Sequence, residues 1–237
     1  MDRPRPPSLP YPALNRLSHA ISFCLSGLVL ECVFTMDFIG PDLDTRTFER
    51  DGLPVSYTEI HRNHVRLTLV AKGAVIFGVV VALSWLVWQF RAQANVRALG
   101  VKGLRFRPTV SVATWLVPVA NLVLPFFAVR ELHRASDPDS GPLDWRHQRS
   151  FPVLWVWWLA LLSVLALLVI AYQGLGPHPS FDRLMTRDRF VRGAAGVGLV
   201  ASLLAIVIVE SINARVFGKM EALMASSWAE WRRGGGA

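Results

Sequence analysis

Four stretches of the chain are long and apolar enough to cross a membrane as helices. The clearest covers residues 67–90, which carry a single charge, Lys72. A helix needs about 20 mostly apolar residues to cross the hydrocarbon core of a bilayer, and the other stretches have similar lengths. The pattern therefore predicts an all-α integral membrane protein. Its predicted spans are residues 20–39, 67–90, 151–172 and 193–212.

A fifth apolar stretch, residues 108–129, is uncharged but is interrupted by Pro118 and Pro125. Each proline removes a backbone hydrogen bond and clashes with the preceding turn of a helix. Broken backbone inside a membrane is tolerated only where protein or a water-filled cavity covers it. The stretch is therefore predicted to be either a kinked span or a re-entrant, partly interfacial pair of short helices.

The two ends of the chain differ from the predicted membrane domain, residues 20–212. Residues 1–19 contain five prolines and three arginines, a composition typical of a disordered tail. Residues 213–237 have apolar residues at spacings of three and four, which predicts an amphipathic helix. This helix either lies on the membrane surface or extends the last span. Its apolar face holds Phe217, Met220, Met224, Trp228 and Trp231, with Lys219, Glu221 and Glu230 mostly opposite.

The distribution of positive charge tests whether residues 108–129 cross the membrane. If they do not cross, 16 Lys and Arg residues lie on the inner side and 8 on the outer side. If they do cross, each side holds 12. Only the first arrangement follows the positive-inside bias. We therefore expect a protein of the cell membrane with four transmembrane helices and one broken segment that does not cross. Both termini are expected in the cytoplasm.

The net charge of +8 is better explained by loops that face anionic lipid headgroups than by nucleic-acid binding. No nucleic-acid-binding fold or motif is recognisable. Docking of a cytoplasmic protein is the alternative for the most basic loop. This basic cluster consists of Arg91, Arg97, Lys102, Arg105 and Arg107.

Two motifs stand close together in the chain: FRAQANVRALG at residues 90–100, followed by GLRF, and WLVPVANLVLP at residues 115–125, followed by REL and AS. Together they resemble the bacterial membrane family catalogued as domain of unknown function 4328. The resemblance is densest over residues 90–136 and extends by hydropathy over residues 67–212. It implies a multi-pass membrane domain and no assigned activity. The family-motif positions are Arg91, Asn95, Arg97, Leu99, Gly100, Pro118, Asn121, Pro125 and Glu131.

Two ionisable residues, Glu31 and Lys72, fall inside predicted spans at comparable depths. An ionisable group inside a span is a functional-site hypothesis by default. The pair is interpreted as a proton or ion relay, or as a buried pair that fixes the register of two helices. In the third interpretation both side chains extend to the surface.

Further polar residues have both a functional and a structural interpretation. Asn121, between two prolines, either binds a ligand or ion or satisfies backbone groups that the prolines open. His61 and His64 have a metal-capable spacing, but Arg62 and Arg66 beside them repel a cation, so we expect a solvated loop. No metal site, cofactor or catalytic motif is predicted.

Two stripes of small residues are spaced by four along predicted spans. Such stripes let helix backbones approach closely, and we expect them to pack within the protein, with dimerisation as the alternative. The stripes are Ala74, Gly78 and Ala82 in one span and Ala194, Gly198 and Ser202 in another.

These features favour a scaffold or interaction protein of the membrane, with a protein partner or a second copy of the chain as candidate partners, over an enzyme. The alternative hypothesis is a small-solute or ion pathway through the bundle that uses Glu31, Lys72 and Asn121.

Overall fold

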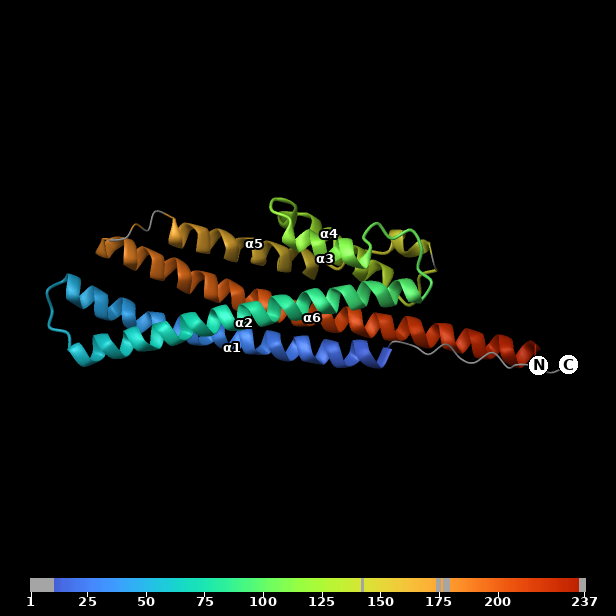
Figure 1. Ribbon diagram of the computed structural model, residues 1–237, viewed down its shortest axis with the longest axis horizontal. Coiled ribbons are helices and arrows are strands. Elements are labelled where there is room, and N and C mark those ends of the chain that lie inside the picture. The colour runs from blue at the N-terminus through green and yellow to red at the C-terminus, as the bar shows by residue number, and fades with distance from the viewer. Residues whose placement is uncertain (1–10, 142, 174–175, 177–179, 235–237) are drawn as a thin grey trace. The chain divides into compact units, whose positions relative to one another are not determined.

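The computed structural model describes residues 11–141, 143–173, 176 and 180–234, and all regular structure in these ranges is helical (Figure 1). Four helices in this part of the chain are long and apolar enough to cross a membrane, which confirms the predicted number. They are α1 (Tyr11–Arg50), α2 (Tyr57–Ala98), α5 (Val153–Tyr172) and α6 (Phe181–Gly234). The short elements are α3 (Pro108–Leu116), η1 (Ala120–Leu122), α4 (Leu124–Ala135) and η2 (Asp144–His147).

Three of the long helices extend well beyond the apolar stretches that predict them. Residues 40–66, between the first two predicted spans, are helical except for residues 51–56. Polar turns hold this extension together, because Arg46 pairs with Asp42 one turn earlier at 2.6 Å and with Asp188 of α6 at 3.5 Å. Hydropathy locates the middle of each helix, whereas these polar contacts determine where the helix ends.

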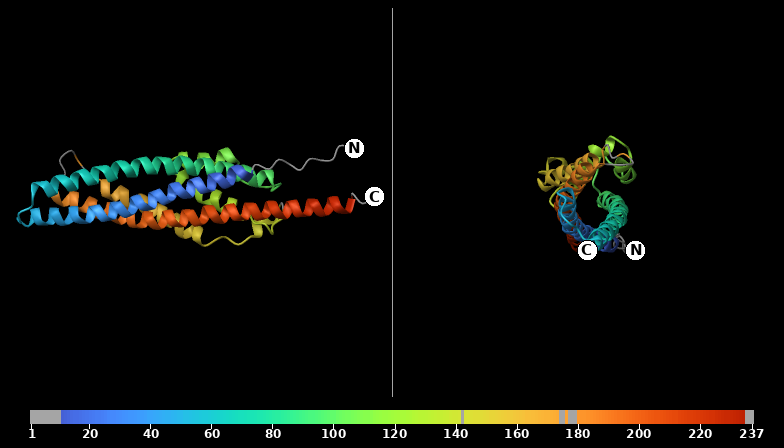
Figure 2. Two further views of the ribbon diagram at one scale, coloured as in Figure 1. Left: turned by 90° about the horizontal axis from the view of Figure 1, so that it is seen from below. Right: turned by 90° about the vertical axis from the view of Figure 1, so that its left-hand side faces the viewer.

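The structure corrects the first predicted end segment and selects one of the two alternatives for the last. Helix α1 begins at Tyr11, so residues 11–19 are helical and not disordered; residues 1–10 lie outside the described residues. Helix α6 is unbroken from Phe181 to Gly234, as its orange-to-red ribbon in Figure 2 shows. Residues 213–234 therefore extend the last predicted span and do not form a separate helix.

The proline-containing stretch folds into two short helices joined by a 3₁₀ turn. Pro108 and Pro125 each stand in the first turn of a helix, where the missing N–H costs nothing. Pro118 lies in the connection, and Val117 before it is extended (φ −87°, ψ 116°), as a residue before proline prefers. Helices α3 and α4 contact each other. We call α3, η1 and α4 the hairpin.

The chain divides into two compact units. The first comprises Met1–Ser22, Ser84–Leu154 and Val207–Ala237, and the second comprises Phe23–Leu83 and Trp155–Ile206. The core of the first unit includes the fully buried Trp88, Val96, Leu132, Ile208 and Ile212. The second unit has a core of small residues on α6, including Ala194, Ala201 and Ala205. All the family-motif positions lie in the first unit.

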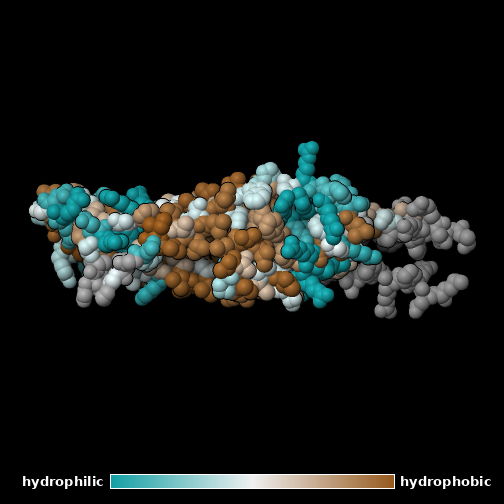
Figure 3. Space-filling model, turned by 90° about the horizontal axis from the view of Figure 1, so that it is seen from above, coloured by the Kyte–Doolittle hydropathy of each residue, from teal (hydrophilic) through white to brown (hydrophobic). Residues whose placement is uncertain are grey.

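Large apolar side chains are exposed along the long helices. Examples are Phe23, Leu69, Val75 and Leu159, all more than half exposed. Figure 3 shows hydrophobic residues over much of the surface of one face, with hydrophilic residues gathered elsewhere on it. This distribution is the one that a lipid-facing surface requires.

Candidate functional site

One face of α2 carries a row of large polar and aromatic residues at four-residue spacing: Trp85, Gln89, Gln93 and Arg97. Residues four apart lie one above the other on a helix. Gln89 and Gln93 are completely buried. Buried polar groups need hydrogen-bond partners, and this row finds them on the hairpin and on the loop before it.

Gln89 connects α2 to α3. Its Oε1 accepts hydrogen bonds from the indole N–H groups of Trp85 at 3.0 Å and Trp115 at 2.8 Å. Its amide N–H donates to Ser111 Oγ. One turn further, the Gln93 amide donates to the Ala128 carbonyl of α4 at 3.4 Å. The two glutamines thus connect both helices of the hairpin to α2.

Arg97 and Glu131 hold residues 104–106 from two sides. The Glu131 carboxylate accepts the backbone N–H of Arg105 at 2.9 Å and that of Phe106 at 3.0 Å. Arg97 Nη2 donates to the carbonyls of Leu104 at 3.2 Å and Phe106 at 2.9 Å. We call this arrangement the clamp. It assigns a structural role to two family-motif positions.

The loop reaches the clamp through two glycines with positive φ. Gly100 (φ +84°) follows the end of α2 in the left-handed conformation that glycine favours, and Gly103 (φ +73°) turns the chain again. Burial raises the pKa of Glu131, while the two backbone N–H donors and the charges of Arg97 and Arg105 oppose that rise. Each carboxylate oxygen accepts one backbone N–H of the loop, so Glu131 has a structural role in holding residues 105 and 106.

Lys219 of α6 connects that helix to the loop after α4. Its ammonium donates to the carbonyls of Asp137 and Ser140, both at 2.9 Å, and to Ser140 Oγ at 3.0 Å. One turn earlier, Arg215 pairs with the Asp137 carboxylate at 2.8 Å. The ammonium also lies 3.4 Å from the Ala135 carbonyl at the C-terminus of α4, where the helix dipole favours a cation. Lys219 is only 5% exposed, although the predicted amphipathic pattern places it mostly opposite the apolar face of the helix.

His133 of α4 lies in the same unit and is 1% exposed. Its ring stacks on Phe151 with centroids 5.1 Å apart, and its Nε2 lies 3.4 Å from Ser211 Oγ. Burial, followed by the positive charge of Arg215, lowers the pKa of His133 to about 4. The ring is therefore neutral near pH 7. Its Nδ1 has no hydrogen-bond partner, so this Ser–His contact lacks the third group that orients a catalytic base.

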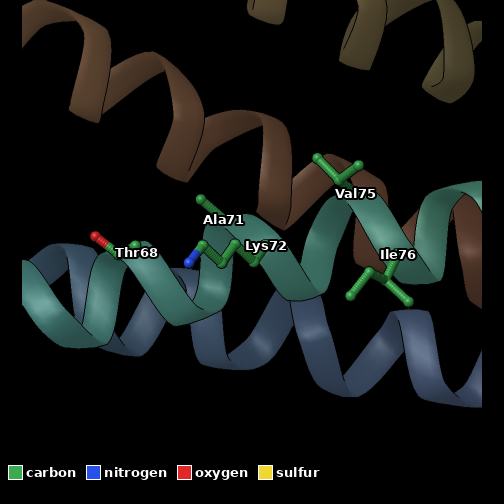
Figure 4. A pocket seen from close by; sticks show the side chains of 5 residues that line it. All are labelled: Thr68, Ala71, Lys72, Val75 and Ile76. Carbon is green, nitrogen blue, oxygen red and sulfur yellow. The ribbon is translucent and has the colours of Figure 1, made fainter.

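The expected pair of Glu31 and Lys72 is not formed. Glu31 is 8% exposed, Lys72 is exposed, and the ion pairs found in the described residues do not include either. Gly73 lies against Glu31, since a Cβ there would be 2.8 Å from Oε2. Lys72 is one residue away, about 100° around the helix. It lines a shallow pocket with other α2 residues (Figure 4): Thr68, Ala71, Val75 and Ile76.

The two small-residue stripes differ in environment. Ala194 and Ser202 are buried, and a Cβ on Gly198 would lie 3.3 Å from Cys32 Sγ of α1. In the other stripe Ala74 and Ala82 are exposed, and a Cβ on Gly78 would meet nothing within 4 Å. The internal packing expected for the stripe on α2 is therefore absent from the described structure.

The remaining candidates are placed as follows. Asn121 is half-buried in η1, and its backbone N–H donates to the Val117 carbonyl at 3.0 Å. His61 and His64 are exposed, and within the described ranges no three His, Cys, Asp or Glu side chains could hold a metal ion. Arg97 of the basic cluster is part of the clamp, where it bonds to the carbonyls of residues 104 and 106. Among the other motif and cluster positions, Asn95 is buried and Leu99 is half-buried. The exposed positions are Arg91, Lys102, Arg105 and Arg107.

Sequence reasoning missed Gln89, Gln93, His133 and Lys219. The four-residue spacing from Trp85 to Arg97 was a visible signal for the glutamines, because polar residues repeated on one helix face need partners. No comparable signal exists for Lys219, since its acceptors lie about 80 residues earlier in the chain.

Comparison with known proteins supports the resemblance. No curated protein and no solved structure matches the chain. The family model described as "Domain of unknown function (DUF4328)" matches residues 51–214. This range includes the clamp, the hairpin, α2, α5 and the first part of α6. The chain therefore belongs to the DUF4328 family.

Proposed function

We propose that this protein is a multi-pass membrane scaffold whose hairpin enters the inner leaflet and returns to the cytoplasmic side. The observation that carries the proposal is the contrast between the two ends of the hairpin. Its base is held by the clamp and by Lys219, whereas its tip exposes large apolar side chains. These are Leu116, Val117, Val119 and Val123, each more than half exposed.

The dimensions of the hairpin support entry without crossing. Helix α3 has 9 residues and α4 has 12, so at 1.5 Å per residue they are about 14 and 18 Å long. The hydrocarbon core is about 30 Å thick. Exposed apolar surface costs about 25 cal/mol per Å² in water, and placing the tip in lipid removes that cost.

The charge distribution supports the direction of entry. A non-crossing hairpin leaves 16 Lys and Arg residues inside and 8 outside, in line with the positive-inside bias. Exposed Arg91, Lys102, Arg105 and Arg107 then face the cytoplasm. They form a surface for anionic headgroups or for a protein partner.

A scaffold role fits the way the buried polar groups are used. Gln89, Arg97, Glu131 and Lys219 all bond to other parts of the same unit. Such groups stabilise a fixed arrangement of the helices and the loop. The observation that favours the alternative, a solute or ion pathway, is Glu31, a buried carboxylate whose Oε1 has no hydrogen-bond partner.

Cysteine accessibility tests both the placement and the alternative. Single cysteines replace Ser56, Val119, Asp139 or Glu31 in a chain whose Cys24 and Cys32 are serine, and membrane vesicles of each orientation are treated with an impermeant maleimide. We expect Asp139→Cys to react only from the cytoplasmic side, Ser56→Cys only from the other side, and Val119→Cys from neither. Reaction of Val119→Cys or Asp139→Cys from the outer side contradicts the placement. Reaction of Glu31→Cys favours the pathway.

A further inference from the structure

Two arginines of α4 converge on one hydroxyl group. Arg130 Nε donates to Ser150 Oγ at 2.7 Å, and Arg134 Nη2 donates to the same oxygen at 2.6 Å. Arginines usually meet carboxylates in such positions. The ion pairs found in the described residues do not include Arg130 or Arg134.

This group consists almost entirely of hydrogen-bond donors. A serine oxygen accepts through two lone pairs, and both are used here, so the Ser150 O–H can only donate. Each guanidinium has five N–H donors and no acceptor. Arg134 Nε is buried without a hydrogen-bond partner. Burial and the charge of Arg130 lower the pKa of Arg134.

We propose that Arg130, Arg134 and Ser150 form a binding site for a phosphate group. A tetrahedral oxyanion supplies the negative charge and the acceptor atoms that this donor group lacks, and guanidinium forks match phosphate geometry. Like charges held close together are unfavourable, and a bound phosphate removes this repulsion. The two arginines lie one turn apart on α4, so they present their forks on one face.

The position of the site in the chain indicates the source of the phosphate. Ser150 precedes α5 by three residues, and a helix N-terminus adds partial positive charge. Trp155, in the first turn of α5, is 47% exposed, as a tryptophan in the aromatic belt of a membrane interface is. Ser150 then lies at the level of the headgroups, where phospholipid phosphates are found. This source rests on the proposed membrane placement; the phosphate site itself does not.

Titration calorimetry on the full chain in mild detergent tests the site. The probes are short-chain phosphatidylglycerol and inorganic phosphate. The Arg130→Gln/Arg134→Gln variant should lose about tenfold or more in affinity. The control Arg183→Gln/Arg189→Gln removes the same charge from exposed positions on α6 and should change affinity by less than about threefold. Arg130→Lys/Arg134→Lys keeps the charge without the fork and should bind at an intermediate strength.

Saturable binding of both probes assigns the phosphate group itself as ligand, and binding of the lipid alone assigns the headgroup. Equal losses in the test and control variants, or no saturable binding of either probe, overturn the proposal. If the double glutamine variant does not fold, Ser150→Ala decides, because it removes only the shared hydroxyl. A loss of about threefold or more supports the site, and an unchanged affinity overturns it. Binding in detergent is independent of the cysteine-labelling result, so failure of one proposal is distinguishable from failure of the other.

Discussion

The clamp makes a quantitative prediction for Glu131→Gln. The carboxylate accepts two backbone N–H groups, at 2.9 and 3.0 Å. The variant has one acceptor oxygen, so one N–H loses its partner and faces an amide N–H₂. Hydrogen bonds to charged groups contribute about 1.5–3 kcal/mol each, and an unsatisfied buried donor costs a further ~1–3 kcal/mol. Burial of the carboxylate, which raises its pKa, offsets part of this loss. We expect a net loss of about 3 kcal/mol.

Thermal unfolding in detergent, followed by circular dichroism, measures the effect. For a chain of this length about 3 kcal/mol lowers the Tm by about 6–12 °C. Glu49→Gln, at an exposed site in α1, is the control and should change stability by less than about 0.5 kcal/mol.

A double-mutant cycle with Arg97→Met tests whether the two side chains act on the same loop. Once Glu131→Gln has freed residues 104–106, the second change should cost less, with a coupling of about 0.5–3 kcal/mol. Additive losses within about 0.5 kcal/mol would refute the clamp as a joint unit.

Three further predictions follow from buried contacts. Burial lowers the pKa of His133 from 6.5 to about 4. The neutral ring therefore contributes fully to stability above pH 6.5, and this contribution is lost as the pH falls towards 4. Lowering the pH from 7 to 5 should reduce the free energy of unfolding by about 2 kcal/mol. Melting curves of His133→Phe should lack that pH dependence, those of exposed His147→Phe should keep it, and equal slopes would contradict the assignment. Lys219→Met leaves several acceptors unpaired and should lower the free energy of unfolding by about 3–5 kcal/mol. The control Glu221→Gln, at an exposed site, should lower it by less than about 0.5 kcal/mol. Similar Tm values for the two variants would show that the ammonium does not stabilise the loop. Gly198→Leu places a large side chain opposite Cys32 Sγ and should lower the free energy of unfolding by about 1–3 kcal/mol. Gly193→Leu should not lower it, because a Cβ at Gly193 meets nothing within 4 Å. The reverse order of Tm values in a thermal-shift assay would contradict the packing.

Features encoded by neighbouring residues could be predicted from the sequence. The apolar run at residues 67–90 predicted the central part of α2, and Pro118 and Pro125 predicted a broken segment. Each signal acts through the local backbone or through transfer of apolar side chains to lipid. Features that depend on distant residues could not be predicted in the same way.

The failed predictions show the reason in particular residues. Glu31 and Lys72 have matching depths, yet a rotation of one residue on α2 presents Gly73 to Glu31 instead. Depth is readable from sequence, whereas the rotation of a helix about its axis depends on its neighbours. Lys219 has the hydropathy of a solvated residue, and only the carbonyls of residues 137 and 140 make its burial favourable. Helix length was underestimated because polar turns have no hydropathy signal.

The long sequence separation between Lys219 and its acceptors imposes an order on biosynthesis. The loop at residues 135–140 leaves the ribosome about 80 residues before the lysine that completes its bonding, and chains grow at about 5–20 residues per second. For several seconds the newly made hairpin therefore exists without one of its supports. Quality-control proteases that recognise loose backbone have access to the nascent chain during this interval, and the arrival of Lys219 ends it.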